Sequence, residues 1–201
     1  MRLLLLSAAL VLSSALAPVA RAENADRDKP MNVEADSLRY DDLRQVSVFT
    51  GHVVLTKGTI LIRGGRLEVR QDPDGFQYGI VTADAGKRAF YRQKREGVDE
   101  WIEGESEVID YDGKADRVKF IRQAELRRLR GATPADEMAG SLITYENTTD
   151  VFTVDGGPAS PRPGGRVRAV LAPREAASAP ARPAAPPAKL RPTPRLSGDT
   201  Q

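Results

Sequence analysis

Apolar and polar residues alternate through the middle of the chain, from about Lys29 to Asp155. The alternation is clearest in five pairs of apolar residues that are separated by one position: Met31 and Val33, Val46 and Val48, Val53 and Leu55, Ile60 and Ile62, and Leu67 and Val69. A period of two is typical of strands with one buried face. Turn-forming residues recur every 8–12 positions, as in Asp41-Asp42, Thr50-Gly51, Lys57-Gly58, Gly64-Gly65, Asp72-Pro73-Asp74-Gly75, Glu96-Gly97, Asp112-Gly113 and Glu146-Asn147. This spacing predicts an all-β fold in which short antiparallel strands form a sandwich, a barrel or a roll.

The same pattern occurs twice along the chain. Tyr40 and Phe49 stand nine residues apart, as do Tyr111 and Phe120, at an offset of 71. After an insertion of about five residues at 131–136 the match resumes at an offset of 76, where Ile62, Gly64, Leu67 and Val69 meet Met138, Gly140, Ile143 and Tyr145. Self-similarity at a fixed offset indicates that one structural unit is stacked on another. We therefore expect the function to lie in an extended β surface rather than in a compact catalytic pocket.

One segment fits this interpretation less well. Residues 122–130 (RQAELRRLR) are rich in helix-forming residue types. The internal repeat, however, aligns them with Val53-Val54-Leu55, which has the pattern of a strand. We follow the repeat and predict a strand.

The N-terminus has the pattern of a secretory signal. Arg2 precedes an uncharged apolar run of 15 residues, Leu3–Ala17, and Ala20-Arg21-Ala22 places small residues around a cleavage point. We expect residues 1–22 to be removed as a signal peptide, so that the mature chain begins at Glu23. The alternative is a transmembrane anchor, which needs about 20 apolar residues and is therefore longer than this run.

The C-terminal segment, residues 157–201, differs in composition from the domain expected at 23–156. It holds ten of the 14 prolines, and its eight basic and two acidic residues give it a net charge of +6, against +2 for the whole chain. With so few large apolar side chains it is predicted to be disordered. Its charge suits either a solvated spacer or contact with an anionic glycolipid or wall polymer. Nucleic acid is disfavoured because no aromatic residues are interleaved with the basic ones.

The chain lacks the residues that several kinds of catalytic or binding site require. There is no cysteine, no phosphate-binding glycine motif, and a single histidine, His52, which disfavours a histidine-based metal site or a Ser-His-Asp arrangement. Acidic residues cluster at Glu103, Glu105, Glu107, Asp110 and Asp112, and paired carboxylates can hydrolyse glycosides. The three glutamates alternate along one segment, which is typical of a solvated strand face. We therefore predict no enzyme, no catalytic residue, no metal and no cofactor.

Together these features resemble the LptA family of periplasmic lipopolysaccharide transport proteins, which have the OstA-like domain. The match covers about Pro30 to Val154 and rests on an ordered series of short motifs. These are Pro30-Met31-Asn32-Val33-Glu34-Ala35-Asp36, Phe49-Thr50-Gly51-His52-Val53, Gly58-Thr59-Ile60, Gly86-Lys87-Arg88-Ala89-Phe90-Tyr91, Glu103-Gly104-Glu105-Ser106 and Gly140-Ser141-Leu142-Ile143-Thr144-Tyr145. The long tail is not part of the family pattern.

The resemblance implies an antiparallel β-jellyroll of many short strands, rolled into a V-shaped trough that holds the acyl chains of lipopolysaccharide. The positions that match the family's lipid-contacting residues are Met31, Val33, Phe90 and Tyr111. One further apolar family position falls on Gly113, which is a departure from the pattern. Additional apolar candidates for the same interior are Phe49, Leu55, Ile60, Ile62 and Phe120. The sequence leaves open which strand face points inward around Phe49 and Phe120.

The resemblance also implies a head-to-tail protein bridge, with an LptC-like inner-membrane protein at the N-terminal edge and an LptD-like outer-membrane protein at the C-terminal edge. The candidate docking edges are Met31, Asn32, Val33, Glu34 and Ala35 at one end, and Val151, Phe152, Thr153 and Val154 at the other. Neither segment carries the proline or lysine residues that usually block strand addition. The alternative is that both are ordinary edge strands.

Other interpretations stay open at this point. Arg122, Arg127, Arg128 and Arg130 could meet the phosphates of a lipid head group, or they could form a solvated face. An LptC-like protein shares the fold but keeps a membrane anchor. An adaptor protein would use its strand edges without binding lipid, and a secreted glycan-acting enzyme would use the acidic cluster described above.

Overall fold

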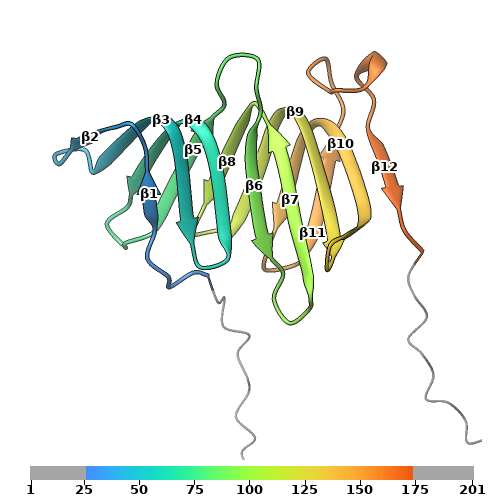
Figure 1. Ribbon diagram of the computed structural model, residues 1–201, viewed down its shortest axis with the longest axis horizontal. Coiled ribbons are helices and arrows are strands. Elements are labelled where there is room, and N and C mark those ends of the chain that lie inside the picture. Colours follow the sequence, from blue (N-terminus) through green and yellow to red (C-terminus); the bar gives the residue numbers. More distant parts are fainter. Residues whose placement is uncertain (1–25, 174–201) are drawn as a thin grey trace, which may run out of the picture. The chain divides into compact units, whose positions relative to one another are not determined.

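The computed structural model describes residues 26–173, which form strands joined by short turns (Figure 1). The one helical segment in this part of the chain is a 3-10 turn at Pro163–Gly165. The strands are β1 (Asn32–Glu34), β2 (Ser37–Asp41), β3 (Val46–Lys57), β4 (Ile60–Gln71), β5 (Gln77–Thr82), β6 (Ala89–Lys94), β7 (Glu100–Ser106), β8 (Val108–Asp112), β9 (Arg117–Arg130), β10 (Thr133–Glu146), β11 (Val151–Asp155) and β12 (Arg168–Leu171). The predicted all-β fold is confirmed, and residues 122–130 lie in a strand. The signal peptide expected at 1–22 lies outside the described residues.

All twelve strands belong to one antiparallel sheet that folds back on itself. The four long strands β3, β4, β9 and β10 pass through both parts of the fold, which we call half A and half B. In half A they pair with β1, β6, β7 and β12, and in half B they pair with β2, β5, β8 and β11. Apolar side chains from both halves meet in a single core. This arrangement agrees with the rolled jellyroll that the resemblance implies.

Two of the long strands bend at bulges where they pass from one half to the other. In β3 the bulge lies at Gly51 and His52, whose φ angles are 82° and 47°. In β9 it lies at Arg122 and Gln123, whose φ angles are 62° and 50°. Bulges of this kind bend a strand and increase its local twist, so they determine where the sheet folds.

The internal repeat of the sequence is also a repeat of backbone geometry. The hairpins β2–β3 and β8–β9 have the same register, because Tyr40 pairs with Ser47 in the first and Tyr111 pairs with Val118 in the second. The bulge in β9 likewise lies 71 residues after the bulge in β3. The predicted insertion at 131–136 lengthens the second long hairpin, whose strands have 14 residues each against 12 in β3 and β4.

The repeat extends to strands that the sequence pattern alone does not align. Strand β12 lies on β10 as β6 lies on β4, because Met138 pairs with Ala169 where its equivalent Ile62 pairs with Tyr91. In the same way β1 corresponds to the second part of β7, β2 to β8, and β11 to β5. The fold therefore consists of two successive units of six strands, β1–β6 and β7–β12.

Strand β12 lies inside the segment 157–201 that the composition predicts to be disordered, so that prediction is wrong for residues 157–171. The backbone N–H of Gln123 donates to the carbonyl oxygen of Ala159 (2.8 Å), and β12 pairs with β10. Order here comes from backbone pairing with an existing strand edge, which composition does not report. Residues 174–201 lie outside the described part of the chain.

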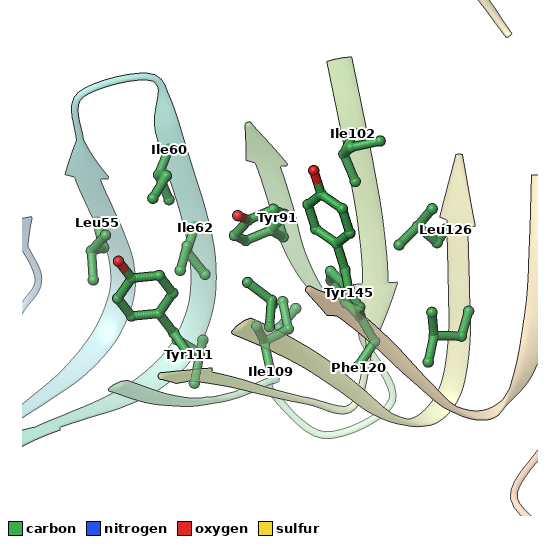
Figure 2. Close-up of a cluster of buried hydrophobic side chains, with 14 of the residues drawn as sticks. Leu55, Ile60, Ile62, Tyr91, Ile102, Ile109, Tyr111, Phe120, Leu126 and Tyr145 are labelled. Atoms are coloured by element: carbon green, nitrogen blue, oxygen red, sulfur yellow. The ribbon is translucent and has the colours of Figure 1, made fainter. Parts of the chain in front are cut away.

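Side chains fill the interior between the two halves. Figure 2 shows Tyr91, Tyr111 and Tyr145 projecting into it from β6, β8 and β10. The edge of one ring in the pair Tyr91–Phe120 meets the face of the other, with 5.6 Å between centroids and 79° between planes. Phe120 also lies directly over Gly104, where a Cβ atom would fall inside the contact distance of the ring. Burying one such side chain contributes about 1.5–3 kcal/mol.

The contact between Phe120 and Gly104 generates a stability prediction. Gly104→Ala is expected to lower the free energy of unfolding by about 1–3 kcal/mol, because the added methyl group overpacks a fully buried ring. The matched control is Gly79→Ala, since a Cβ at this buried glycine would lie 3.5 Å from Leu67 Cδ1, an ordinary contact. Urea denaturation of both variants checks the prediction, and equal midpoints would contradict it.

The buried tyrosines predict a loss of stability at alkaline pH. Burial raises the pKa of Tyr111 to about 12, with a further contribution from the charge of Asp116. Because the folded pKa lies above the unfolded value of about 10, the stabilisation is complete below pH 10 and is lost as pH rises towards 12. Tyr111→Phe cannot ionise and is expected to avoid roughly 2–3 kcal/mol of that loss, measured as urea midpoints between pH 8 and pH 12. A midpoint that falls as steeply as that of the unmodified protein would argue against this origin.

Candidate functional site

Eight of the nine residues predicted to line the interior do face it. Tyr111 and Phe120 are buried in the core, together with Leu55, Ile60 and Ile62. Met31, Val33 and Phe49 are half-buried and pack against the same core. The structure therefore resolves the orientation that the sequence left open, because Phe49 and Phe120 both point inward.

Phe90 is the exception, and its expected place in the interior is wrong. Its neighbours Ala89 and Tyr91 are fully buried, whereas Phe90 is half-buried on the opposite face of β6. There the guanidinium of Arg63 lies 5.7 Å from the centre of its ring. Adjacent aromatic residues in a strand point to opposite faces, so only one of Phe90 and Tyr91 can enter the core, and Tyr91 does.

Gly113, where the family pattern has an apolar residue, has no room for a side chain. Its backbone N–H donates to the carbonyl oxygen of Gln77 (3.0 Å), and a Cβ atom there would lie 2.5 Å from that oxygen. The departure therefore reflects the close approach of two backbone segments.

The interior is open at its N-terminal end. A cleft of about 190 Å³ lies there. Its apolar lining comes from Met31, Val33, Tyr40, Phe49 and Val69, and its polar rim from Gln45, Ser47, Gln71 and Gln77. Beyond the cleft, in the described part of the chain, the two halves pack directly on each other through fully buried side chains. In place of the V-shaped trough that the resemblance implies, the structure has a cleft that leads into a closed apolar interior.

Sequence reasoning missed most of the side chains that fill this interior. They include Tyr91, Ile102, Ile109, Leu126, Ile143 and Tyr145, all with at most 1% of their surface exposed. Each belongs to an alternating pattern, so the period of two carries the signal. Three of them, Tyr91, Ile143 and Tyr145, lie within the family motifs, but they were not among the positions matched to lipid contacts.

The turns of half A meet the turns of half B along the side of the sheet opposite the bulges, and we call this boundary the mouth. Polar side chains close it. At the N-terminal part of the mouth, the Lys57 Nζ donates to the Gln77 Oε1 (3.2 Å). The Arg27 guanidinium donates to the carbonyl oxygen of Lys114 (3.0 Å) and lies over the ring of Phe76. The backbone N–H and the hydroxyl of Thr59 in half A both donate hydrogen bonds to the carboxylate of Asp26, which holds this N-terminal segment against half A.

A cluster of six charged side chains, the mouth cluster, closes the C-terminal part. It contains Arg95, Glu100, Arg128, Arg130, Asp136 and Asp150. Arg95 and Glu100 form an ion pair, and Glu100 also accepts from Arg130 Nε (3.1 Å). Burial alone would raise the pKa of Glu100, but the hydrogen bonds from Arg130 and Arg95 hold that pKa below its usual value. Burial would also raise the pKa of Asp150, but the hydrogen bond and charge of Arg95, with the hydrogen bond from Tyr145, together lower it.

The four arginines considered as phosphate ligands all have carboxylate partners within the protein. Arg122 pairs with Glu107 (2.7 Å), and Arg127 lies 3.5 Å from Glu105. Arg128 and Arg130 belong to the mouth cluster. Two of the four therefore lie at the mouth of the interior.

Two of the acidic residues considered for catalysis are paired with arginines on the outer face of half A. Glu103 pairs with Arg92 (3.2 Å), and Glu105 pairs with Arg88 (2.6 Å). This geometry is that of an ion-paired surface. Within residues 26–173, no three acidic or histidine side chains are grouped closely enough to hold a metal ion.

The sheet ends in four strands that have one neighbour each. Strands β1 and β2 pair only with β3, and β11 and β12 pair only with β10 among the described strands. The predicted edges, Met31–Ala35 and Val151–Val154, therefore do include edge strands, but β2 and β12 were missed. Large apolar side chains are exposed on three of these strands: Leu38 and Tyr40 on β2, Val151 on β11, and Val170 and Leu171 on β12. Strands β1 and β2 lie at one end of the sheet and β12 lies at the other (Figure 1).

Comparison with known proteins gives consistent matches to one family. The family model of LptA and the LptD N-terminal domain, described as an LPS transport protein, matches residues 32–151. The lipopolysaccharide export system protein LptH of Pseudomonas aeruginosa is 32% identical over 165 residues, which cover 79% of this chain and 88% of LptH. The export system protein LptA of Escherichia coli K12 is 33% identical over 144 residues, covering 70% of this chain and 74% of LptA.

The fold matches as well. The crystal structure of LptH from Pseudomonas aeruginosa, described as the LptA-homologous periplasmic component of the lipopolysaccharide transport device, superposes with a TM-score of 0.64. The two sequences are 28% identical, and the match covers 74% of this chain and 99% of LptH. Within residues 26–173, no helix has the length and hydropathy needed to cross a membrane. On the family model, the sequence matches and the shared fold, this chain belongs to the LptA family.

Proposed function

We propose that this protein is a periplasmic carrier, exported by the signal at residues 1–22, that holds the acyl chains of lipopolysaccharide. It would form one segment of a protein bridge that moves the lipid from the inner to the outer membrane. The observation that carries the proposal is an apolar interior that opens at one end as a cleft and is flanked at both ends by strands with one free edge. The transport names of its relatives support the same role.

The energetic need for such a carrier follows from the lipid. Moving one CH₂ group from an apolar environment into water costs about 0.8 kcal/mol. A chain of about 12 carbons therefore costs roughly 10 kcal/mol, or some seven factors of ten in equilibrium. Lipopolysaccharide carries several chains, so it needs an apolar path across an aqueous compartment.

Loading requires the two halves of the sheet to separate. The side chains that would contact acyl chains, such as Phe120 and Tyr111, pack on each other in the closed state. The cleft at Met31 and Phe49 is then the entrance, because it is the part of the interior that is already open. Lipid chains replace contacts between the halves with contacts of the same apolar kind, so the cost of opening is offset.

The junction between the two six-strand units provides a template for the junction between molecules. Inside the chain, β5 of the first unit pairs with β8 of the second, and β6 pairs with β7. Their equivalents at the chain's ends are β11 with β2, and β12 with β1. A second copy placed by the same geometry would therefore join through both halves of the sheet.

This template changes the partner strands expected from the sequence. Strands β11 and β1 lie in different halves, so the predicted pairing of Val151–Val154 with Met31–Ala35 would join half B to half A. A junction built on the internal template would instead pair Phe152 with Tyr40 of the next copy, and Ala169 with Val33 of the next copy. The exposed apolar side chains of β2, β11 and β12 support this arrangement.

Charge complementarity supports the same register. On the template, Arg168 of β12 lies opposite Glu34 of β1 in the next copy. Directly opposed charges of opposite sign stabilise an antiparallel pair. An LptC-like protein would meet β1 and β2, and an LptD-like protein would meet β11 and β12. The family model, which joins LptA to the LptD N-terminal domain, favours partners of the same fold.

A photoreactive phenylalanine derivative at position 49 tests lipid binding. Phe49 lines the cleft and is expected to give an adduct with lipopolysaccharide on irradiation. The control is the same substitution at Phe90, which lies on the outer face and is expected to give none. Mass spectrometry of the adducts checks the result. Equal labelling at the two positions, or none at Phe49, would contradict the carrier role.

Cysteine pairing tests the junction, because the chain has no cysteine of its own. A chain with Ala169→Cys mixed with a chain with Val33→Cys is expected to form a disulfide-linked dimer under mild oxidation. The control for a slipped register is Val167→Cys mixed with Val33→Cys, which places the first cysteine two residues away on the same strand face. Non-reducing electrophoresis measures both yields. A higher yield from the control pair would rule out the templated register.

A further inference from the structure

The position of a lipid head group is constrained by the position of the chains. If acyl chains lie between half A and half B, as the proposed function requires, the polar head must emerge where the apolar interior meets water. That boundary is the mouth. At its C-terminal part the mouth carries the cluster of three arginines and three carboxylates.

Arg95 is the member of this cluster that joins the two halves. It follows β6 in half A, and its partner Asp150 lies in the turn between β10 and β11 in half B. The contact is bidentate: Arg95 Nε lies 3.2 Å from Asp150 Oδ1, and Arg95 Nη2 lies 2.9 Å from Asp150 Oδ2. Two parallel N–H donors of a guanidinium bind a phosphate in the same way.

The two carboxylate partners of Arg95 are not equivalent. Glu100 comes from the same half, and its side chain is 14% exposed. Asp150 comes across the mouth, and its side chain is 49% exposed, although that of Arg95 is only 15% exposed. Asp150 is therefore the partner that can leave when the halves separate, while Glu100 continues to hold the guanidinium in place.

The surroundings of Arg95 suit an incoming anion. The Tyr145 hydroxyl lies 3.1 Å from Asp150 Oδ1 and can donate to whichever oxygen occupies that place. Arg128 Nε is buried without a hydrogen-bond partner among the described residues. Three arginines face three carboxylates while Asp150 is in place, so its departure leaves one positive charge uncompensated.

We propose that Arg95, with Tyr145, is a phosphate-binding site for the head group of the transported glycolipid, and that Asp150 is an internal substitute which the phosphate displaces. The inference rests on the proposed carrier function. Displacement also removes a direct link between half A and half B. Binding of the head group and opening of the interior are thus coupled through one ion pair.

Two variants test the site in the full-length chain, with lipid A carrying two phosphates and with dephosphorylated lipid A as probes. Arg95→Gln is expected to weaken binding of the phosphorylated lipid about tenfold, since a charge-assisted bidentate contact is lost. Asp150→Asn is expected to tighten it, because the competing charge is removed while the Tyr145 hydrogen bond is kept. Both variants remove the ion pair that joins the two halves, so neither should weaken binding of the dephosphorylated lipid. The control is Arg122→Gln, which removes an outer-face arginine paired with Glu107 and should leave both affinities unchanged.

Each outcome separates this inference from the carrier function. If the unmodified chain binds neither lipid, the carrier function itself fails. If it binds both lipids equally and Arg95→Gln weakens both alike, the carrier function stands and the phosphate site is overturned. Weaker binding of the phosphorylated lipid to Asp150→Asn would show that Asp150 is not a competitor. If the circular dichroism spectrum shows that Arg95→Gln is unfolded, the binding measured for Asp150→Asn decides whether the phosphate site stands.

Free phosphate is distinguished from a lipid head group by competition. Inorganic phosphate at the same concentration as the lipid is expected not to displace it, because the acyl chains supply most of the binding. Displacement at equal concentration would assign the site to free phosphate and overturn the lipid assignment.

Discussion

Backbone hydrogen bonding at strand edges is the constraint on which the whole fold depends. At each of its ends, a six-strand unit has two strands with one unpaired edge, one strand in half A and one in half B. Inside the chain the second unit satisfies these edges of the first, through β5 with β8 and β6 with β7. At the ends of the chain the same edges remain open. A fold built from one repeated unit thus carries, in its own centre, the geometry by which it can continue into another molecule.

The bends in the long strands let one sheet supply both walls of the interior. The bulges at Gly51-His52 and at Arg122-Gln123 turn β3 and β9 from half A into half B. Residues other than glycine in left-handed backbone cost of order 1 kcal/mol or more, yet three of these four positions carry side chains. That cost is tolerated because the apolar faces on both sides of each bend would otherwise stay exposed.

Much of this architecture can be predicted from the sequence, because the determining signals are local. Alternation identifies strands, and the offset between Tyr40 and Tyr111 identifies the repeat, which aligns residues 122–130 with a strand. Local signals cannot choose between Phe90 and Tyr91, since the choice depends on how β6 lies against β4 and β7. They also miss β12, whose order comes from the open edge of β10 rather than from its own composition. The mouth cluster joins turns that are far apart in the chain, as in Arg95 and Asp150, so no spacing of residues in the sequence predicts it.

A carrier must release what it binds, and a closed apolar interior contributes to release. When the two halves pack on each other, they bury the apolar side chains that a lipid chain would otherwise cover, so closure of the interior offsets part of the affinity for the lipid. Electrostatics at the mouth follows the same logic, because Asp150 already occupies the guanidinium that a phosphate would take. Apolar and polar parts of the ligand thus each displace an internal equivalent. In the proposed bridge, this competition would limit the affinity and favour transfer of the lipid to the next subunit.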